Sequence, residues 1–168
     1  MICPSCGFDN IAGTELCEEC GQDLAGLDLP APSIGFQRHL FEDTLRELPM
    51  DHPANLRVDT SVADAVQAMK THTVGCVLVF EGERLAGIFT ERDLLTKLPL
   101  EQRDLSRVKL REVMTPDPAL LHEEDTIAYA LNRMSVGGFR HVPVLRAQQP
   151  IGVISIRDVL QYISKRLG

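Results

Sequence analysis

The sequence predicts an α+β protein made of two related units, with a small cysteine-rich element before them. The 168 residues are 44% apolar and 24% charged, a composition typical of globular proteins. A gapless alignment that places 45–95 on 110–160 has 15 of 51 positions identical, which indicates an internal repeat. Four of the five cysteines precede Gly21. We therefore expect a cysteine-rich domain at 1–23, a linker at 24–35, a first repeat with a leading helix at 36–107, and a second repeat at 108–168.

The cysteine-rich element has the spacing of a metal site. Two CxxC pairs are separated by ten residues, and a glycine, Gly7 or Gly21, follows each pair. Four thiolates form the tetrahedral set that structural zinc accepts and leave no position for a catalytic water. Two disulfides or a redox CxxC are the alternatives; a cytosolic location and the lack of a strand–helix setting argue against them. The segment resembles the small zinc ribbons found at the ends of many bacterial and archaeal proteins, which bind other proteins or nucleic acid. The predicted Zn²⁺ ligands are Cys3, Cys6, Cys17 and Cys20.

Charge is concentrated in the same element. The net charge is −7, and residues 1–29 hold six acidic residues and no Lys or Arg. Phosphate contacts require basic side chains, so nucleic acid is disfavoured as a partner. Apolar runs are too short for a membrane span and the first residues lack a signal-peptide pattern, so we expect a cytoplasmic protein.

Each repeat is expected to contain a short strand, a helix, two strands and a second helix. A leading amphipathic helix is predicted over 36–48. The first helices, 61–70 and 126–135, should bury matched faces that include Met69 and Met134. Cys76 is expected to be an inert core thiol, and Pro143 indicates an edge strand. The predicted strands are 75–80 and 85–89 in the first repeat, and 141–145 and 150–154 in the second.

A basic residue stands in the first turn of the second helix in both repeats. "GIFTERDLL" and "GVISIRDVL" begin their helices at Thr90 and Ser155. The helix dipole makes Arg92 or Arg157 there unfavourable by about 0.3–1 kcal/mol unless an anion is near. In one interpretation the hydroxyl and the Asp form only a capping box and each arginine pairs with a local acid. In the other, the glycine admits a ligand, the hydroxyl and carboxylate hold ribose hydroxyls, and phosphate lies at the helix N-terminus.

The repeated motif, together with "VMTP" at 113–116 and "FRHVPV" at 139–144, resembles a tandem pair of cystathionine β-synthase (CBS) domains, a Bateman module, over about 36–167. This resemblance implies a disc-like module, often dimeric, with clefts that bind AMP, ADP, ATP or S-adenosylmethionine. Because Gly75 and Cys76 align with Arg140 and His141, we expect unequal clefts, the stronger one using the Arg140 and His141 side. The ligand-binding residues that the resemblance implies are Thr90, Arg92, Asp93, Arg140, His141, Ser155, Arg157 and Asp158.

These observations favour a regulatory module that senses an adenosyl nucleotide and signals to a protein partner. We also expect the module to form a homodimer. The alternative is a protein–protein adaptor with unoccupied clefts, in which the zinc ribbon is the docking element. No nucleophile elbow, phosphate-binding glycine loop or paired-carboxylate arrangement is present, so an enzyme is not expected.

Overall fold

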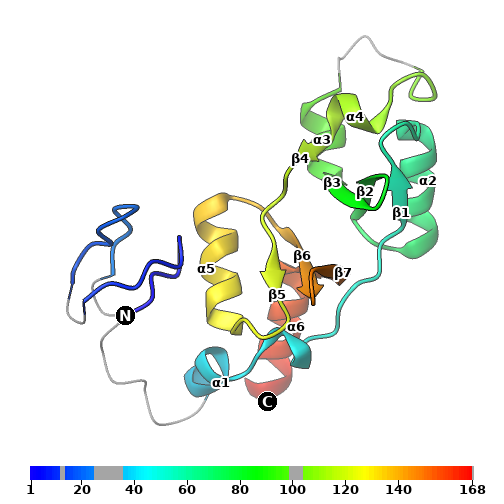
Figure 1. The fold of residues 1–168 in the computed structure, drawn as a ribbon. Coiled ribbons are helices and arrows are strands. Elements are labelled where there is room, and N and C mark those ends of the chain that lie inside the picture. Colours follow the sequence, from blue (N-terminus) through cyan, green and yellow to red (C-terminus); the bar gives the residue numbers. More distant parts are fainter. Residues whose placement is uncertain (12–13, 25–35, 99–103, 168) are drawn as a thin grey trace. The chain divides into compact units, whose positions relative to one another are not determined.

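The computed structural model describes residues 1–11, 14–24, 36–98 and 104–167 (Figure 1). The chain forms two compact units. One unit comprises Met1–Leu48, Glu123–Arg140 and Ile156–Gly168, and the other comprises Pro49–His122 and His141–Ser155. Sheets and helices are both present, so the predicted α+β class is confirmed. The strands of both repeats belong to the second unit, so the units do not coincide with the repeats. The predicted linker lies outside the described residues except for Leu24.

The first sheet has the order β1-β2-β3-β4. β1 (Asn55–Arg57) is parallel to β2 (Cys76–Glu81), and α2 (Val62–His72) connects them. β2 is antiparallel to β3 (Arg84–Thr90). β4 (Thr115–Pro116), which the sequence did not predict, comes from the "VMTP" segment of the second repeat and pairs with β3. This pairing places the start of the second repeat beside the first repeat's Thr90 motif.

The second sheet places β6 (His141–Arg146) between β5 (Leu121–His122) and β7 (Gln149–Ser155). The prediction that Pro143 marks an edge strand is therefore wrong, because β6 is central. The short β5 pairs only with Val144 and Leu145, so Pro143 lies beyond the stretch that β5 covers. A residue without an N–H is tolerated in a central strand when one neighbouring strand is this short.

The two repeats have the same strand register. Cys76 pairs with Thr90 in the first sheet, and His141 pairs with Ser155 in the second, which are equivalent positions in the sequence alignment. The register shift after Val79 recurs after Val144. The repeat predicted from the sequence is therefore a repeat of backbone structure as well as of residues.

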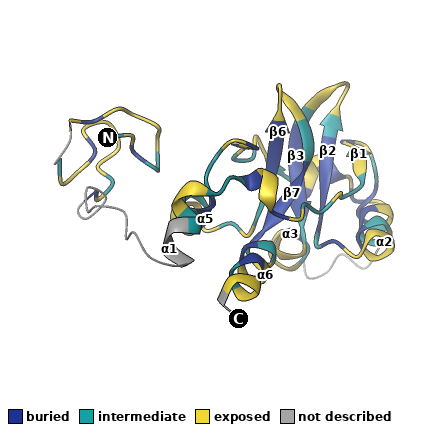
Figure 2. Ribbon diagram, turned by 90° about the horizontal axis from the view of Figure 1, so that it is seen from below, coloured by how far each residue is buried: buried dark blue, intermediate teal, exposed yellow. Residues whose placement is uncertain are grey.

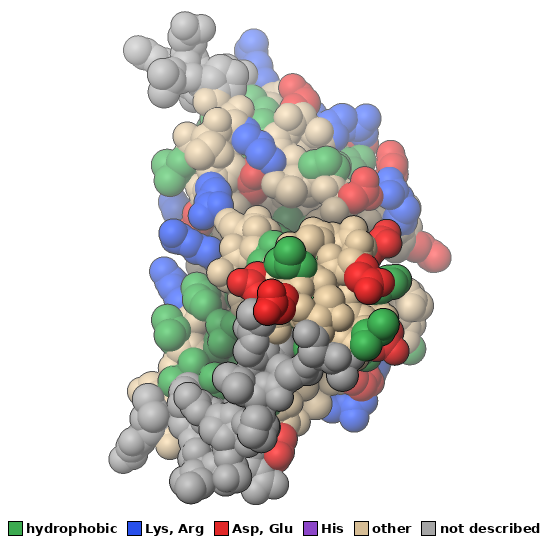
Figure 3. Space-filling view, turned by 90° about the vertical axis from the view of Figure 1, so that its left-hand side faces the viewer, with side chains coloured by type: hydrophobic (Ala, Val, Ile, Leu, Met, Phe, Trp, Pro, Cys, Tyr) green, Lys and Arg blue, Asp and Glu red, His purple; other side chains and the backbone are tan. Residues whose placement is uncertain are grey.

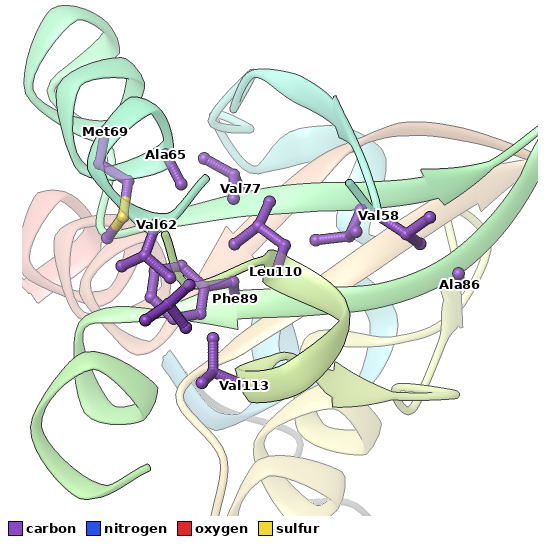
Figure 4. Packing of buried hydrophobic residues seen from close by; sticks show 11 residues of the cluster. Val58, Val62, Ala65, Met69, Val77, Ala86, Phe89, Leu110 and Val113 are labelled. Carbon is purple, nitrogen blue, oxygen red and sulfur yellow. The ribbon is translucent and has the colours of Figure 1, made fainter. Parts of the chain in front are cut away.

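The core of the second unit forms where α2 packs on the first sheet. Val62, Ala65 and Met69 lie at helical spacing and are buried with Phe89 of β3 (Figure 4). Ser61 caps the helix by accepting from the Asp64 N–H at 3.1 Å. Cys76 is fully buried in a neighbouring apolar cluster, as expected for a core thiol. Figure 2 shows the buried strands against the more exposed helices. The other helices of this unit are α3 (Glu91–Thr96) and α4 (Leu110–Val113).

Helices make up most of the other unit. α1 (Phe36–Glu42) is followed by a short 3₁₀ helix, η1 (Leu45–Glu47), and the chain also contributes α5 (Ile127–Gly137) and α6 (Ile156–Leu167). The predicted single helix over 36–48 is wrong, because Thr44 forms a bridge with Thr126 and Leu45 N–H donates to the Asp125 carbonyl at 2.9 Å. None of the described helices is long and apolar enough to cross a membrane.

Candidate functional site

The four N-terminal cysteines form one cluster. The Sγ atoms of Cys3, Cys6, Cys17 and Cys20 all lie within 4.8 Å of one another. Cys3 and Cys20 approach to 3.6 Å, and Cys6 and Cys17 to 3.5 Å. All five cysteines of the chain are free, so the disulfide alternative finds no support. Four sulfur donors in this arrangement fit a tetrahedral structural metal ion.

Two matching turns build the cluster. In the first, Cys3 N–H donates to the Phe8 carbonyl and Gly7 N–H donates to the Cys3 carbonyl, at 2.8 and 2.9 Å. In the second, Cys17 and Gly21 make the corresponding bonds, both 2.8 Å long. Gly7 and Gly21 have φ of 76° and 68°, a conformation that glycine adopts without steric cost. The glycines after each CxxC therefore allow the turns that gather the sulfur atoms.

Asn10 supports the cluster, and sequence reasoning missed it. Its side chain donates to the Phe8 carbonyl at 3.0 Å and contacts Cys17 Sγ at 3.6 Å, while its Oδ1 accepts from Glu18 N–H at 3.0 Å. It is buried, and a polar residue directly after the first turn was the only signal. Desolvation raises the pKa of the Cys17 thiol, but hydrogen bonds from nearby backbone and from Asn10 outweigh it and lower that pKa to about 6. The Cys6 thiol shifts in the opposite direction: a hydrogen bond with the Phe8 backbone lowers its pKa, but desolvation and the neighbouring thiols raise it to about 12.

Leu24 belongs to this element and not to the linker. It is buried with Cys3 and Cys17, and its N–H donates to the Glu15 carbonyl at 2.7 Å. The cysteine-rich domain therefore extends one residue beyond its predicted end at residue 23.

The first repeated motif forms a capping box at the start of α3. Thr90 N–H donates to Asp93 Oδ2 at 2.9 Å, and the Thr90 hydroxyl donates to the same oxygen at 2.8 Å. Asp93 Oδ1 accepts from the Thr115 hydroxyl at 3.0 Å and from Lys97 Nζ at 2.7 Å. Desolvation raises the pKa of Asp93, but the hydrogen bonds from Lys97, Thr90 and Thr115 hold it below its usual value. The capping interpretation therefore applies to Thr90 and Asp93.

The motif glycines are close to another chain segment. A Cβ at Gly87 would lie 2.7 Å from Met114 Sδ, and one at Gly152 would lie 2.9 Å from the Asp51 carbonyl oxygen. From the sequence, we interpreted these glycines as positions at which a ligand could approach the backbone. Instead, they admit the segments that lead into the opposite repeat.

The predicted arginines are exposed. Arg92, Arg140 and Arg157 all have exposed side chains. Ile156 N–H donates to the Arg140 carbonyl at 3.1 Å, which places the Arg140 backbone beside the first turn of α6, the turn that contains Arg157. Neither the Arg140 nor the Arg157 guanidinium forms an ion pair or hydrogen bond with a described residue. Two exposed cations therefore lie near the start of α6, whose first turn also contains the carboxylate of Asp158.

Ser155 is buried at the end of β7 in the second unit, whereas Asp158 lies in α6 and is partly exposed. His141 lies next to Gly75, since a Cβ at Gly75 would be 3.3 Å from His141 Nε2 and 3.2 Å from Glu91 Cδ. In the first repeat, Glu91 and Gly75 therefore occupy the positions that Ile156 and Arg140 occupy in the second.

A small pocket of about 130 Å³ opens in the second unit, and the sequence did not predict it. It lies along β7 before Ser155. Its lining residues are His52, Pro53, Asn55, Leu78, Pro150, Ile151 and Gly152.

Comparison with known proteins identifies the repeats. The CBS domain family matches residues 45–100 and 110–165. The CBS domain-containing protein CBSX3 of Arabidopsis thaliana, a mitochondrial protein, is 36% identical over 110 residues, which is 62% of this chain and 53% of that protein. This match therefore covers only about half the length of the curated relative.

Solved structures agree with the family match. A protein with CBS domains from Burkholderia ambifaria superposes with a TM-score of 0.68 at 28% identity, over 74% of this chain and 93% of that one. The CBS domain pair of protein MJ0100, solved with 5′-methylthioadenosine and S-adenosylmethionine, has a TM-score of 0.64 at 18% identity, over 73% of this chain and 96% of that one. The chain thus belongs to the CBS-domain family and carries two CBS domains in tandem behind a four-cysteine cluster.

Proposed function

We propose that the chain is a regulatory module that binds an adenosyl nucleotide, namely AMP, ADP, ATP or S-adenosylmethionine, in a cleft of its CBS pair. The ligand then changes the conformation or the oligomeric state, and a protein partner responds to that change. Such a response requires that the ligand bind two states with different affinity.

The main support for nucleotide binding is the pair of exposed arginines at the start of α6, Arg140 and Arg157. Arg140 is held beside the first turn by the Ile156 N–H bond of 3.1 Å, and Arg157 lies within that turn. α6 has 12 residues, so its N-terminus carries the positive end of a full helix dipole. Two guanidinium groups near such an end favour the binding of an anion, and both arginine and helix N-termini bind phosphate.

The pocket in the second unit is a separate observation, because all of its lining residues belong to that unit. Leu78 and Ile151 supply apolar surface, and Asn55 and His52 supply hydrogen-bonding groups. Its volume is below the roughly 300 Å³ of a complete small-molecule site, so this pocket does not by itself hold a nucleotide. The support for an adenosyl ligand comes instead from the related MJ0100 pair, which was solved with two of them.

Isothermal titration of ligand-free protein with AMP, ADP, ATP and S-adenosylmethionine tests the proposal. We expect binding of at least one of them, weakened about tenfold or more by Asp158→Asn, because hydrogen bonds to charged groups contribute about 1.5–3 kcal/mol. Arg157→Gln should weaken ATP more than S-adenosylmethionine, which has no phosphate. Absence of binding of all four ligands at millimolar concentration would contradict the proposal.

We also propose that the cysteine cluster holds Zn²⁺ as a structural ion. Metal analysis should find one zinc per chain, and Cys17→Ser should lose it. Because zinc binding contributes of order 10 kcal/mol in such small domains, the ribbon should unfold while the CBS pair keeps its circular dichroism. Cys76→Ala is the matched control, since this buried cysteine lies outside the cluster, and it should retain the zinc.

A second candidate function, that of a protein–protein adaptor, is favoured by the ribbon surface. Four large apolar side chains are exposed on this acidic element, and the side view in Figure 3 shows hydrophobic and acidic side chains in the same area. They are Ile2, Phe8, Ile11 and Leu16. The combination fits a protein partner and disfavours nucleic acid. An adaptor keeps its partner's response in the Asp158→Asn variant, whereas a sensor loses nucleotide dependence.

Homodimerisation and a cytoplasmic location, both expected from the sequence, stay predictions. Analytical ultracentrifugation tests the first. Fractionation of cells tests the second, and the mitochondrial relative makes it a necessary experiment.

A further inference from the structure

Both carboxylate oxygens of Asp93 accept hydrogen bonds from other residues of the protein. A carboxylate accepts about four hydrogen bonds through its two oxygens. Oδ2 accepts from the Thr90 N–H and hydroxyl, and Oδ1 accepts from Thr115 and Lys97, with distances of 2.7 to 3.0 Å. Asp93 is only 5% exposed. No acceptor position is left for a pair of ribose hydroxyls.

The donors of the Lys97 ammonium group also have partners within the protein. Its ammonium group contacts Asp93 Oδ1 at 2.7 Å, the Met114 carbonyl at 3.1 Å and the Thr115 hydroxyl at 2.8 Å. These three partners match the three donors of an ammonium group. A ligand that bound Asp93 would have to break this closed network of Lys97, Thr115 and Asp93.

The second repeat has no equivalent of the Lys97 ammonium group or of the Thr115 hydroxyl. The position of Lys97 corresponds to Tyr162, and that of Thr115 corresponds to Met50. The Tyr162 hydroxyl donates to Asp43, and Arg166 stacks over the Tyr162 ring with its guanidinium 4.5 Å from the centroid. The residue equivalent to Lys97 is thus directed to a different partner, and a methionine cannot donate to a carboxylate.

The phosphate side of the first motif is also unfavourable. Glu91 stands beside Gly75 where the second repeat has Ile156 beside Arg140. A carboxylate there repels phosphate. α3 has only six residues, so it offers a weaker helix dipole than α6.

We infer that Lys97 and Thr115 close the first motif and that the module binds one adenosyl nucleotide per chain, through the second motif alone. This inference rests on the proposed function and specifies which of the two duplicated motifs carries it. The Asp93 motif then serves to join β4 of the second repeat to the first repeat.

Isothermal titration with AMP and with 5′-methylthioadenosine tests the inference. The second probe lacks a phosphate, so Glu91 does not repel it. We expect one equivalent per chain for the wild type, less than a twofold change in affinity in Asp93→Asn, and at least a tenfold loss in Asp158→Asn. Lys97→Met combined with Thr115→Val should raise the number of 5′-methylthioadenosine equivalents from one to two, and adding Asp93→Asn to that variant should restore one.

The outcomes separate the two proposals. Two equivalents in the wild type, or a tenfold loss in Asp93→Asn, overturns the inference and leaves the proposed function standing. One equivalent of 5′-methylthioadenosine in the variant that combines Lys97→Met with Thr115→Val also overturns the inference, provided that circular dichroism shows this variant to be folded. If the double variant does not fold, the same titration is made with Lys97→Met alone. No binding of either probe to any variant overturns the inference; the proposed function falls with it only if ADP, ATP and S-adenosylmethionine also fail to bind.

Discussion

Asp93 and Asp158 occupy the same place in two repeats that share one strand register, but the residues at the positions of Lys97 and Thr115 differ. The first repeat surrounds its aspartate with Lys97 and Thr115, whereas the second has Tyr162 and Met50 at those positions. The strand pairs Cys76↔Thr90 and His141↔Ser155 are nevertheless equivalent. A duplicated backbone can therefore carry different side chains around its two motifs, and the proposed difference in ligand binding rests on that.

The largest effect should come from the strand cores of the two repeats. Phe89 and Ile154 occupy equivalent strand positions and are both fully buried. Phe89→Ala should lower the free energy of unfolding by about 3–5 kcal/mol and Ile154→Ala by about 2–5 kcal/mol. Urea denaturation followed by circular dichroism measures both. A loss under about 1 kcal/mol at Ile154 would break the equivalence of the two strand cores.

The motif aspartates should behave differently from each other. Asp93→Asn removes a buried carboxylate with four donors and should lower the free energy of unfolding by about 2–3 kcal/mol. Asp158→Asn, at a partly exposed residue, should cost less than about 1 kcal/mol. The same denaturation experiment compares them, and equal losses would remove the distinction between the two motifs.

Lowering the pH should reduce the contribution of Asp93 to the free energy of unfolding. The pKa of Asp93 is lowered in the folded protein relative to about 3.9 in the unfolded chain, so the carboxylate stabilises the fold above pH 4. As the pH falls below 4 and through the folded-state pKa, this stabilisation is lost. The difference in unfolding free energy between wild type and Asp93→Asn should therefore shrink between pH 5 and pH 3. A difference that stays constant over this range would argue against an ionised Asp93.

The smallest effect concerns the Thr115 hydroxyl. Thr115→Val removes one donor to Asp93 and should cost about 1 kcal/mol. Thr71→Val is a matched control, because that exposed hydroxyl donates only to the Gln67 carbonyl of its own helix; its cost should be below about 0.5 kcal/mol. Thermal unfolding of both variants checks the difference, and equal costs would show that Thr115 adds nothing specific to the first motif.

Local patterns in the sequence predicted much of the fold. The internal repeat predicted the paired strands and the helices α2 and α5, because buried residues recur at helical spacing in both copies. The CxxC pairs predicted the cysteine cluster, because two matching turns need only local hydrogen bonds. The capping box at Thr90 was likewise evident from residues three apart.

Long-range contacts were the part that the sequence could not predict. β4 joins the first sheet through the pairs Gly87↔Pro116 and Ile88↔Thr115, and Lys97 and Thr115 meet at Asp93 only because of that pairing. The bridge that ends the leading helix early joins Thr44 to Thr126, in the opposite repeat. Neither contact leaves a periodic or spacing signal near the residues concerned.

Native mass spectrometry of the protein with AMP or S-adenosylmethionine tests the central claim most directly, because it counts bound zinc and nucleotide on the same chain. We predict one zinc ion and one nucleotide per chain, with the nucleotide lost in Asp158→Asn and kept in Asp93→Asn. Two nucleotides per chain, or one that depends on Asp93, would contradict the assignment of ligand binding to the second repeat.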